Sequence, residues 1–239
     1  MQLENLNLYK KAKATFLYQT EEKSNFPHSK AVLLISVGQA NHEGARLEAT
    51  IKLINDNFQS CDVAVCDTLQ RHTIQMSELS SPEEAYTKSM IEGKQWVKRN
   101  KKHLMLLNVP NEIFFWDKYL KSKDFLHCKD KIVHAYQNDE IFKSSMHVTI
   151  EEFVRRYERR STGVNREKLE EYCFNYLTEE CAIMMLMWPK CEYNYIIYPG
   201  NMPKVLATAR DKFVFPYNPN LLKWTQVYIR SKIVSPTLC

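Results

Sequence analysis

The sequence has 239 residues, of which 44% are hydrophobic, and a formal net charge of +5 at pH 7. This length suits one large or two small domains, and no apolar run approaches the roughly 20 residues that a membrane-spanning helix needs. The amino terminus, MQLENLNLYKKAKATF, lacks the apolar core of a secretory signal. We therefore expect a cytoplasmic protein with no membrane partner.

The cysteine and histidine patterns give no sign of a metal site. The seven cysteines are scattered without a CxxC pair, and the seven histidines show no zinc-ligand spacing. Scattered cysteines in a cytoplasmic chain indicate reduced, packed thiols. We expect no metal.

The chain opens with a polar, lysine-rich segment, and we expect residues 1–29 to form an irregular N-terminal arm. Residues 31–36, AVLLIS, form a short apolar run that is typical of a strand buried on both faces. Gly38 marks a turn because glycine adopts backbone angles that other residues avoid. The apolar spacing that follows predicts a helix from about 43 to 58. Ser36 therefore stands at the carboxyl end of a central strand, where open α/β sheets bind their ligands.

The surroundings of Ser36 match no common catalytic or nucleotide-binding motif. The stretch ISVGQAN is not the GxSxG of an α/β-hydrolase, and it is neither GxGxxG nor GxxxxGK[ST]. On position alone, a hydroxyl that satisfies the backbone of the turn is the simpler interpretation of Ser36.

A second strand and a long helix are predicted next. Residues 62–66, DVAVC, suit a second buried strand, and we expect a loop over 69–81. Ser81 as the cap, Pro82 at the first helical position and two acids in the first turn predict a helix that runs to about residue 102.

The middle of the chain is expected to be mostly helical after a third strand. HLMLLNV at 103–109 predicts that strand, and Pro110 opens a helix over NEIFFWDKYLKSK. Residues 124–160 have a helical apolar pattern. Asn165 can cap a further helix, which ends at Pro189.

The last part of the chain returns to strands. Residues 192–198, EYNYIIY, are β-branched and aromatic and predict a fourth strand. A turn and a helix to about residue 210 follow, and 227–229 is a weak last strand. This alternation predicts a single Rossmann-like α/β domain with a central parallel sheet over residues 30–239.

Two basic clusters suggest a polyanionic partner. The first is a stripe on one face of the helix from 82 to 102, at 3.6 residues per turn, and it consists of Lys94, Lys98, Lys101 and Lys102. The second consists of Arg155, Arg156, Arg159 and Arg160. Charged helix faces are usually only solvated, but single-sign faces are also typical of phosphate-backbone binding.

The helix before Pro189 brings tyrosine and carboxylate together. Tyr176 and Glu180 are four residues apart, so they are neighbours on one face, and the apolar segment 181–188 must be buried. A carboxylate beside that segment is partly desolvated, which suits a group that holds an amine or moves a proton. The alternative is an exposed glutamate at the end of an amphipathic helix.

Four short motifs, taken together and in this order, resemble those of the tRNA-dependent cyclodipeptide synthases. They are ISVGQAN with Ser36, VCDTLQRH at the end of the second strand, NYLTEE with Tyr176 and Glu180, and IIYPGNMP with Tyr198. The resemblance covers residues 30–230. The basic helix lies where this family has its tRNA-binding helix.

Details of the motifs resemble one of the two subfamilies. Gln39 stands where the other subfamily has Asn, and Tyr198 is followed by Pro199, as in the Tyr-Pro subfamily. Leu34 occupies a position that is often Gly in the family. The Asn-Arg pair that some members carry before the Tyr-Glu helix has no match here.

The resemblance implies a fold like the catalytic domain of the class I tyrosyl- and tryptophanyl-tRNA synthetases. The sequence has neither the HIGH nor the KMSKS motif that binds ATP in those enzymes. It also implies that the protein uses two aminoacyl-tRNAs as substrates, without ATP, and has no stable protein partner.

The resemblance implies a role for each of four residues. Ser36 is the nucleophile that forms an aminoacyl-enzyme in a ping-pong reaction, and Tyr176 and Glu180 hold the ammonium of the first aminoacyl group. Glu180 then accepts a proton from the second amine, and Tyr198 relays a proton as the diketopiperazine ring closes.

Further site residues follow from the same resemblance. Those expected to bind the aminoacyl substrate are Val32, Leu34, Gln39, Val65, Asp67, Ile183 and Ile196. Those expected to bind tRNA are Lys94, Lys98, Arg99, Lys101 and Lys102. Two other functions stay open: a serine hydrolase or other acyltransferase that uses Ser36, and a non-catalytic RNA-binding protein with a Rossmann-like fold.

Overall fold

The computed structural model describes residues 9–17, 20–78, 80–159 and 165–234. Its strands are β1 (Tyr9–Leu17), β2 (Lys30–Ser36), β3 (Ser60–Cys66), β4 (Ile113–Phe115), β5 (Tyr195–Tyr198) and β6 (Lys223–Val234). Its α-helices are α1 (Thr20–Lys23), α2 (Gly44–Asn55), α3 (Arg71–Glu78), α4 (Pro82–Leu104), α5 (Asp117–Leu120), α6 (Phe125–Asn138), α7 (Glu140–Glu158), α8 (Arg166–Cys181) and α9 (Lys204–Phe213).

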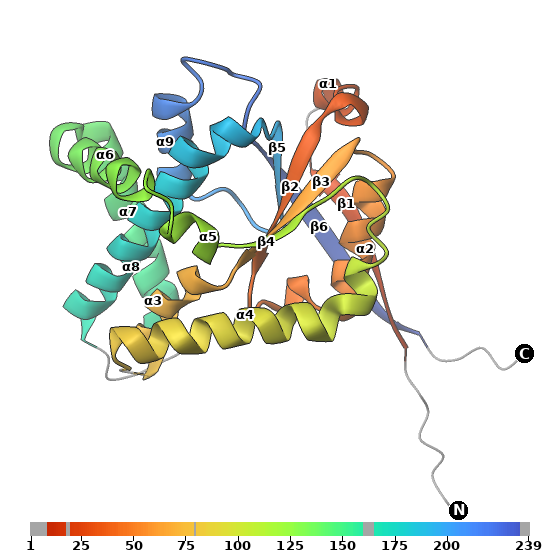
Figure 1. The fold of residues 1–239 in the computed structure, drawn as a ribbon, viewed down its shortest axis with the longest axis horizontal. Coiled ribbons are helices and arrows are strands. Elements are labelled where there is room, and N and C mark those ends of the chain that lie inside the picture. The colour runs from red at the N-terminus through yellow and green to blue at the C-terminus, as the bar shows by residue number, and fades with distance from the viewer. Residues whose placement is uncertain (1–8, 18–19, 79, 160–164, 235–239) are drawn as a thin grey trace, which may run out of the picture.

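The strands form one sheet in the order β1-β6-β5-β2-β3-β4 (Figure 1). Neighbours from β6 to β4 run parallel, and β1 joins the edge antiparallel to β6. The predicted Rossmann-like α/β fold with a central, mostly parallel sheet is confirmed. Because β2 lies between β5 and β3, the carboxyl ends of these three strands meet at one edge of the sheet.

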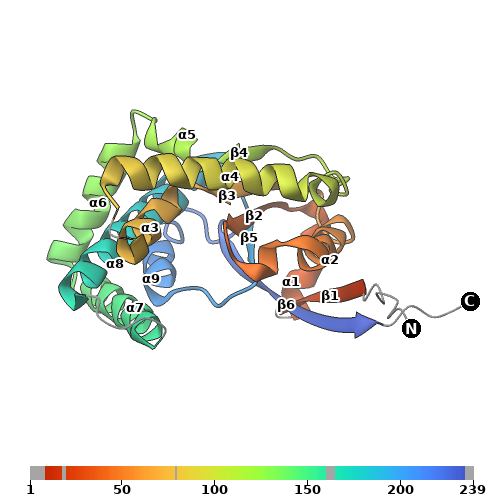
Figure 2. The ribbon, with the colours of Figure 1, turned by 90° about the horizontal axis from the view of Figure 1, so that it is seen from below.

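Alternating side chains divide the interior into two cores, one on each face of the sheet. Val32 and Leu34 pack with residues of α6 to α9, whereas Leu33 and Ile35 pack with residues of α2 and α4. Figure 1 shows α6 to α9 on one side of the sheet and α2 on the other, and Figure 2 shows α4 crossing along one flank. The runs in β2 and β3 are continuous because both faces are buried, at about 1.5–3 kcal/mol for each large aliphatic side chain.

Part of the segment expected to be an irregular arm forms a strand, so that expectation is wrong for residues 9–17. In β1, Ala14 and Phe16 are buried whereas Lys11 and Lys13 are exposed. This alternation is the period-2 pattern of an edge strand with lysines on its solvent face. Residues 1–8, 18 and 19 lie outside the described part of the chain.

The third strand was expected at 103–109, and this prediction is wrong. The helix α4 runs on to Leu104, and the parallel edge strand is β4, within the segment that was expected to be helical. Lys101, Lys102 and His103 occupy the last turn of α4, where cations are favoured by the helix dipole. A short apolar run such as LMLL cannot be assigned to strand or helix by periodicity alone.

The expected loop at 69–81 is also largely wrong, because a 3₁₀ turn (Thr68–Gln70) leads directly into α3. The predicted start of α4 is confirmed: Ser81 and Glu84 form a reciprocal capping box, with Pro82 in the first turn.

The end of α8 passes into a π-helical turn, Ala182–Met187. Within the described residues, no helix is both long and apolar enough to cross a membrane.

Candidate active site

The candidate site lies where β2 and β5 end side by side. Ser36 is the last residue of β2, and Tyr198 is the last residue of β5. Their hydroxyl oxygens are 3.1 Å apart, and either one can donate the hydrogen bond. Residues two apart on a strand share a face, so Ser36 projects to the same side as Leu34. The sheet therefore presents two hydroxyl groups toward α8.

The helix α8 supplies Tyr176 and Glu180 to this face. Glu180 is 7% exposed, and burial, followed by the charge of Glu179, raises its pKa to about 8. Burial raises the pKa of Tyr176, and the Glu180 carboxylate adds to this effect. The same carboxylate raises the pKa of Tyr198, after burial. The structure thus brings together all four side chains that were predicted to be catalytic.

A histidine that was not predicted from the sequence contacts the backbone of Ser36. His42 Nδ1 lies 2.9 Å from the Ser36 amide nitrogen and 3.1 Å from the Ser36 carbonyl oxygen. Burial lowers the pKa of His42 to about 4, so the ring is neutral and bonds one of these groups according to its tautomer. The ring also meets Tyr198 edge-on, with 5.4 Å between centroids. It therefore supports both hydroxyl-bearing residues.

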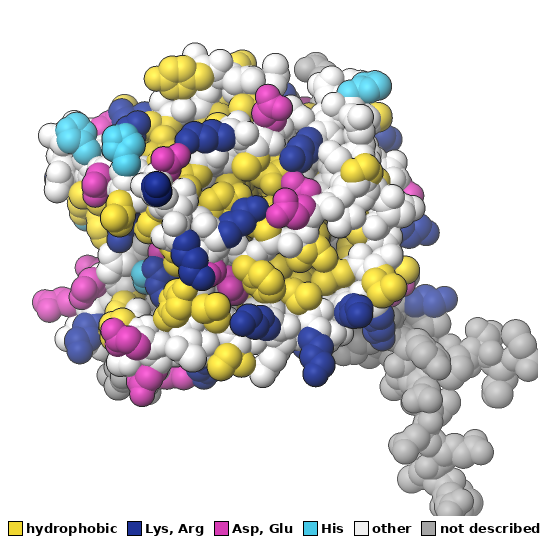
Figure 3. Space-filling view, in the orientation of Figure 1, with side chains coloured by type: hydrophobic (Ala, Val, Ile, Leu, Met, Phe, Trp, Pro, Cys, Tyr) yellow, Lys and Arg dark blue, Asp and Glu magenta, His cyan; other side chains and the backbone are white. Residues whose placement is uncertain are grey.

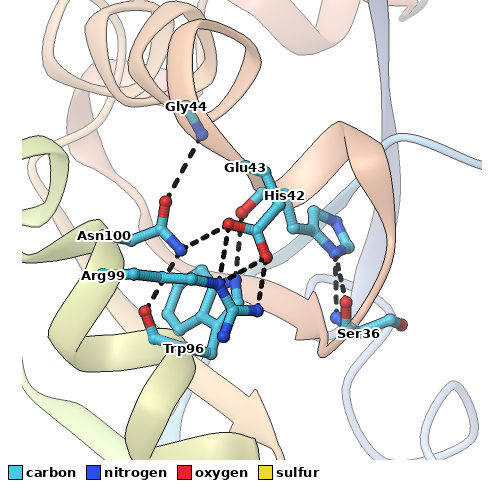
Figure 4. Close-up of polar contacts among 7 residues, drawn as sticks. All are labelled: Ser36, His42, Glu43, Gly44, Trp96, Arg99 and Asn100. Atoms are coloured by element: carbon cyan, nitrogen blue, oxygen red, sulfur yellow. Dashed lines mark hydrogen bonds and ion pairs between the residues drawn. The ribbon is translucent and has the colours of Figure 1, made fainter.

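The segment after His42 is fastened to α4 (Figure 4). Arg99 donates to both carboxylate oxygens of Glu43, with distances of 2.6 to 3.2 Å, and Asn100 donates to the same carboxylate at 2.7 Å. Trp96 Nε1 donates to the His42 carbonyl at 3.1 Å. These contacts connect α4 with the chain that leaves the end of β2.

The predicted basic stripe is an exposed face of α4. Its four lysines are all solvent-exposed, and none is in an ion pair within the part of the chain that the structure describes: Lys94, Lys98, Lys101 and Lys102. Figure 3 shows Lys and Arg side chains gathered over the right-hand half of α4 and acidic ones over its left-hand start. Arg99 differs, because Glu43 already neutralises its guanidinium. A phosphate contact by Arg99 would compete with that ion pair.

The second basic cluster is interspersed with acids. Arg155 pairs with Glu151 at 2.7 Å, and Arg159 donates to the Arg155 carbonyl at 3.2 Å. Arg160 lies outside the described residues. The single-sign surface is therefore on α4 rather than at the end of α7.

Most residues predicted to line the aminoacyl pocket share one core, but Val65 does not. Val32, Leu34, Ile183 and Ile196 belong to the core on the Ser36 side of the sheet, whereas Val65 belongs to the core on the opposite side. The prediction for Val65 is wrong because its neighbours on β3, Ala64 and Cys66, face the Ser36 side of the sheet, and adjacent residues on a strand face opposite ways. Cys66, which pairs with Ser36 across the two strands, faces the site instead.

Two further predicted substrate contacts lie in different environments. Gln39 is exposed, and its backbone N–H donates to the Ser36 carbonyl at 3.2 Å. Asp67 is 2% exposed and accepts from the Asp117 amide at 3.4 Å. A Cβ added to Gly93 of α4 would overlap the Asp67 side chain. Asp67 is thus packed under α4, and a substrate contact by either residue stays a prediction.

Sequence reasoning missed His42, Glu43 and Trp96 as supports of the site. Their spacing to Ser36 carries no recognisable motif, because a 3₁₀ turn (Ala40–His42) folds the chain back on the strand end. Within the described ranges, no group of three or more potential metal-ligating side chains occurs.

Solved structures of cyclodipeptide synthases are similar to this chain. A CDPS, or cyclodipeptide synthase, from Fluoribacter dumoffii has 33% sequence identity and a TM-score of 0.89, over 94% of this chain and 100% of its own. The cyclodipeptide synthase of Candidatus Glomeribacter gigasporarum, bound to Phe-tRNAPhe, has 18% identity and a TM-score of 0.67, over 87% and 91%. Tyrosyl-tRNA synthetase from Archaeoglobus fulgidus has 13% identity and a TM-score of 0.51, over 87% and 58%. No protein-family model matches, and the search of the curated proteins finds no match.

The fold and the site define a synthetase-like α/β protein that gathers serine, tyrosine and glutamate at one edge of its sheet, beside a basic helix. Because the Fluoribacter dumoffii enzyme is 33% identical over nearly the whole of both chains, this chain belongs to the cyclodipeptide synthase family. The expected likeness to class I synthetases is confirmed at the level of the fold. Assignment to the Tyr-Pro subfamily stays a prediction.

Proposed function

We propose that this protein joins two amino acids, each delivered as an aminoacyl-tRNA, into a diketopiperazine through an aminoacyl-enzyme on Ser36. The observation that carries the proposal is the meeting of the Ser36 and Tyr198 hydroxyls, 3.1 Å apart, beside the buried Glu180 carboxyl. Membership of the cyclodipeptide synthase family supports the reaction class. A related enzyme bound to Phe-tRNAPhe supports tRNA as the carrier.

The first half-reaction transfers the aminoacyl group to the protein. The Ser36 Oγ attacks the ester carbonyl carbon, the bond from that carbon to the tRNA ribose oxygen breaks, and the serine proton passes to the departing ribose oxygen. The ester is already activated, so this step requires no ATP. Tyr198, as the hydrogen-bond partner of Ser36, is placed to move that proton.

Glu180 recognises the ammonium group of the first amino acid. Burial, followed by the charge of Glu179, raises its pKa to about 8, so the carboxyl is largely protonated at neutral pH unless a cation binds beside it. A neighbouring cation favours the charged form, and ammonium binding therefore drives ionisation of Glu180. The partly buried Tyr176 on the preceding helical turn completes this end of the site.

The second half-reaction forms the peptide bond and then the ring. The amine of the second aminoacyl-tRNA attacks the acyl carbon on Ser36, and the bond to Oγ breaks. Glu180 accepts the proton lost by the amine, and Tyr198, the hydrogen-bond partner of Ser36, relays a proton to Oγ, which regains its hydroxyl. The amine of the first residue then attacks the remaining tRNA ester, and this step closes the ring and releases the tRNA. Tyr198 relays a proton in this last step.

The exposed lysines of α4 suit the tRNA backbone, because they form a single-sign surface whose charges are not neutralised within the described residues. The contacts between α4 and the segment after His42 connect this surface with the nucleophile strand.

A serine hydrolase is less well supported. His42 contacts the Ser36 backbone, and within the described residues no histidine bonds the Ser36 hydroxyl.

Incubation with a mixture of charged tRNAs, followed by intact-mass spectrometry and product analysis, tests the proposal. We expect one aminoacyl adduct on the parent protein and a cyclodipeptide in solution. The Ser36→Ala variant should lose both, whereas Ser77→Ala, which removes an exposed hydroxyl on α3, should keep both. A parent protein that forms neither adduct nor product would contradict the proposal. Full product formation by Ser36→Ala would remove Ser36 from the mechanism.

A further inference from the structure

Two adjacent buried glutamates at the end of α8 have opposite surroundings. Glu179 is fully buried and accepts hydrogen bonds from Arg71 Nη1 at 2.9 Å and Trp116 Nε1 at 3.1 Å. The second Arg71 nitrogen bonds its other oxygen, and His72 Nε2 lies 3.4 Å from that oxygen. Glu180 has no hydrogen bond or ion pair with any described residue.

Arg71 connects α8 with the strand beside the nucleophile. It is the first residue of α3, directly after the turn that follows β3, and its Nη1 also donates to the Thr68 carbonyl at 2.8 Å. Cys66, the last residue of β3, pairs with Ser36 in the sheet. The guanidinium thus bridges the carboxyl end of β3 and the carboxylate of Glu179.

The ion pair between Arg71 and Glu179 lies close to the point where the regular α-helix α8 ends. Consecutive residues of an α-helix differ by about 100° around its axis, so the direction in which Glu179 is held decides the direction of Glu180. One residue later the regular helix ends, and the chain continues as a π-helical turn. Such turns are frequent at functional sites. The buried ion pair therefore fixes a helix end that lacks a regular continuation.

We propose that Arg71 is a positioning residue for aminoacyl transfer: by holding Glu179, it turns Glu180 toward Ser36 and leaves the Glu180 carboxylate free to receive the substrate ammonium. This inference rests on the proposed function. Glu179 and the Thr68 carbonyl accept the hydrogen bonds of the Arg71 guanidinium, and Glu180 has no such partner among the described residues.

The pair also sets the electrostatic surroundings of Glu180. The other titratable groups that influence or face it are Cys66 from β3, Tyr198 from β5, and Cys173, Tyr176 and Cys181 from α8. Burial raises the pKa of each of these thiols and phenols, so all are neutral between pH 5.5 and 8.5. The charge that raises the pKa of Glu180, after burial, is that of Glu179, which is paired with Arg71. Arg156 of α7 acts on the neighbouring Cys173 and Tyr198, and burial lowers the pKa of His72.

Two substitutions that break the same ion pair should shift the pH profile in opposite directions. The measurement is the single-turnover rate of aminoacyl-enzyme formation between pH 5.5 and 8.5, which rises as Glu180 ionises. Glu179→Gln removes a negative neighbour and leaves a cation, so the rising limb should move down by about one pH unit. Arg71→Gln leaves Glu179 uncompensated, so the limb should move up by a similar amount.

The plateau rate reports the orientation of Glu180 separately from its charge. Both variants should lose about ten- to hundredfold in this rate, because a misplacement near 1 Å has this effect on catalysis. Arg71→Lys keeps the positive charge but loses the bidentate geometry. The rising limb of its pH profile should therefore lie where that of the parent lies, whereas its plateau rate should stay below that of the parent. Arg166→Gln is the control, since it breaks exposed ion pairs at the start of the same helix and should change neither quantity.

Thermal unfolding followed by circular dichroism identifies the variants that are folded. Folded variants with the parent plateau, or with limbs that move in the same direction, would overturn the proposal. If neither single variant folds, the same assay is applied to the double variant Arg71→Gln/Glu179→Gln, in which neither partner is left as an unpaired charge. Its pH profile should rise where that of the parent rises, and its plateau rate should be lower than that of the parent. A double variant that does not fold, or that keeps the parent plateau, would assign the pair to the fold alone. Absence of an adduct on the parent would instead contradict the proposed function.

Discussion

Ionisation of Glu180 should reduce the stability of the folded protein, and Glu180→Gln should therefore stabilise it at high pH. The folded-state pKa is about 8, against 4.5 for an ordinary glutamate. Between these two values the folded state binds the proton more tightly than the unfolded state does. Stability is consequently lost as the pH rises from 4.5 to 8. The ionised Glu180 carboxylate is thus kept at a cost in folding free energy.

The size of this effect follows from the difference in pKa. Each pH unit between the two values corresponds to about 1.4 kcal/mol, so above pH 8 the buried carboxylate costs about 5 kcal/mol. That is a large part of the 5–15 kcal/mol by which domains are usually stable. At pH 5 the glutamine replaces a protonated carboxyl of nearly the same shape, and the difference between the two proteins should be small.

Urea unfolding of the parent and the Glu180→Gln variant at pH 5 and pH 9 measures this effect. The difference in unfolding free energy should grow by several kcal/mol between the two values, because other titrating groups are common to both proteins and cancel. Glu171→Gln, which alters an exposed carboxylate on the same helix, should give no such growth. A difference that stays constant with pH within about 0.5 kcal/mol would refute the reasoning.

Three other predictions concern α4 and the turn that follows β2. Replacing Lys98 and Lys102 together with Ala should weaken binding of charged tRNA and flatten its salt dependence by up to about 0.9 units of slope per contact, whereas Lys88→Ala, which breaks ion pairs with two glutamates, should not. An unchanged salt titration would move the tRNA surface elsewhere. Gly93→Ala should cost more than about 2 kcal/mol in urea unfolding, because the added methyl overlaps the aspartate after β3; a stable, active variant would contradict this packing. Burial lowers the pKa of His42 to about 4, so His42 should cost the parent about 3 kcal/mol of stability as the pH falls from 6.5 to 4. The His42→Gln variant should not show this loss. The same acid sensitivity in parent and variant would refute that assignment.

The sequence alone was enough to predict the centre of the sheet and the side chains that meet at its edge. The apolar runs of β2 and β3 could be recognised because strands buried on both faces need continuous hydrophobic sequence. The start of α4 was readable because caps and first-turn preferences are local. The spacing of Tyr176 and Glu180 predicted neighbours on one helix face, and the structure has both of them beside Ser36 and Tyr198.

Tertiary structure alone decided which short segments pair and which faces they present. The edge strand β4 has three residues, too few for a periodic pattern, and its place depends on pairing with β3. Val65 was assigned to the wrong face because side-chain direction follows from the register of the whole strand. Glu179 and Glu180 are the same residue type in the sequence, but a partly buried guanidinium 108 positions away binds the first and leaves the second without a partner among the described residues. A contact over that distance leaves no local pattern, because it depends on how α3 and α8 pack in the folded chain.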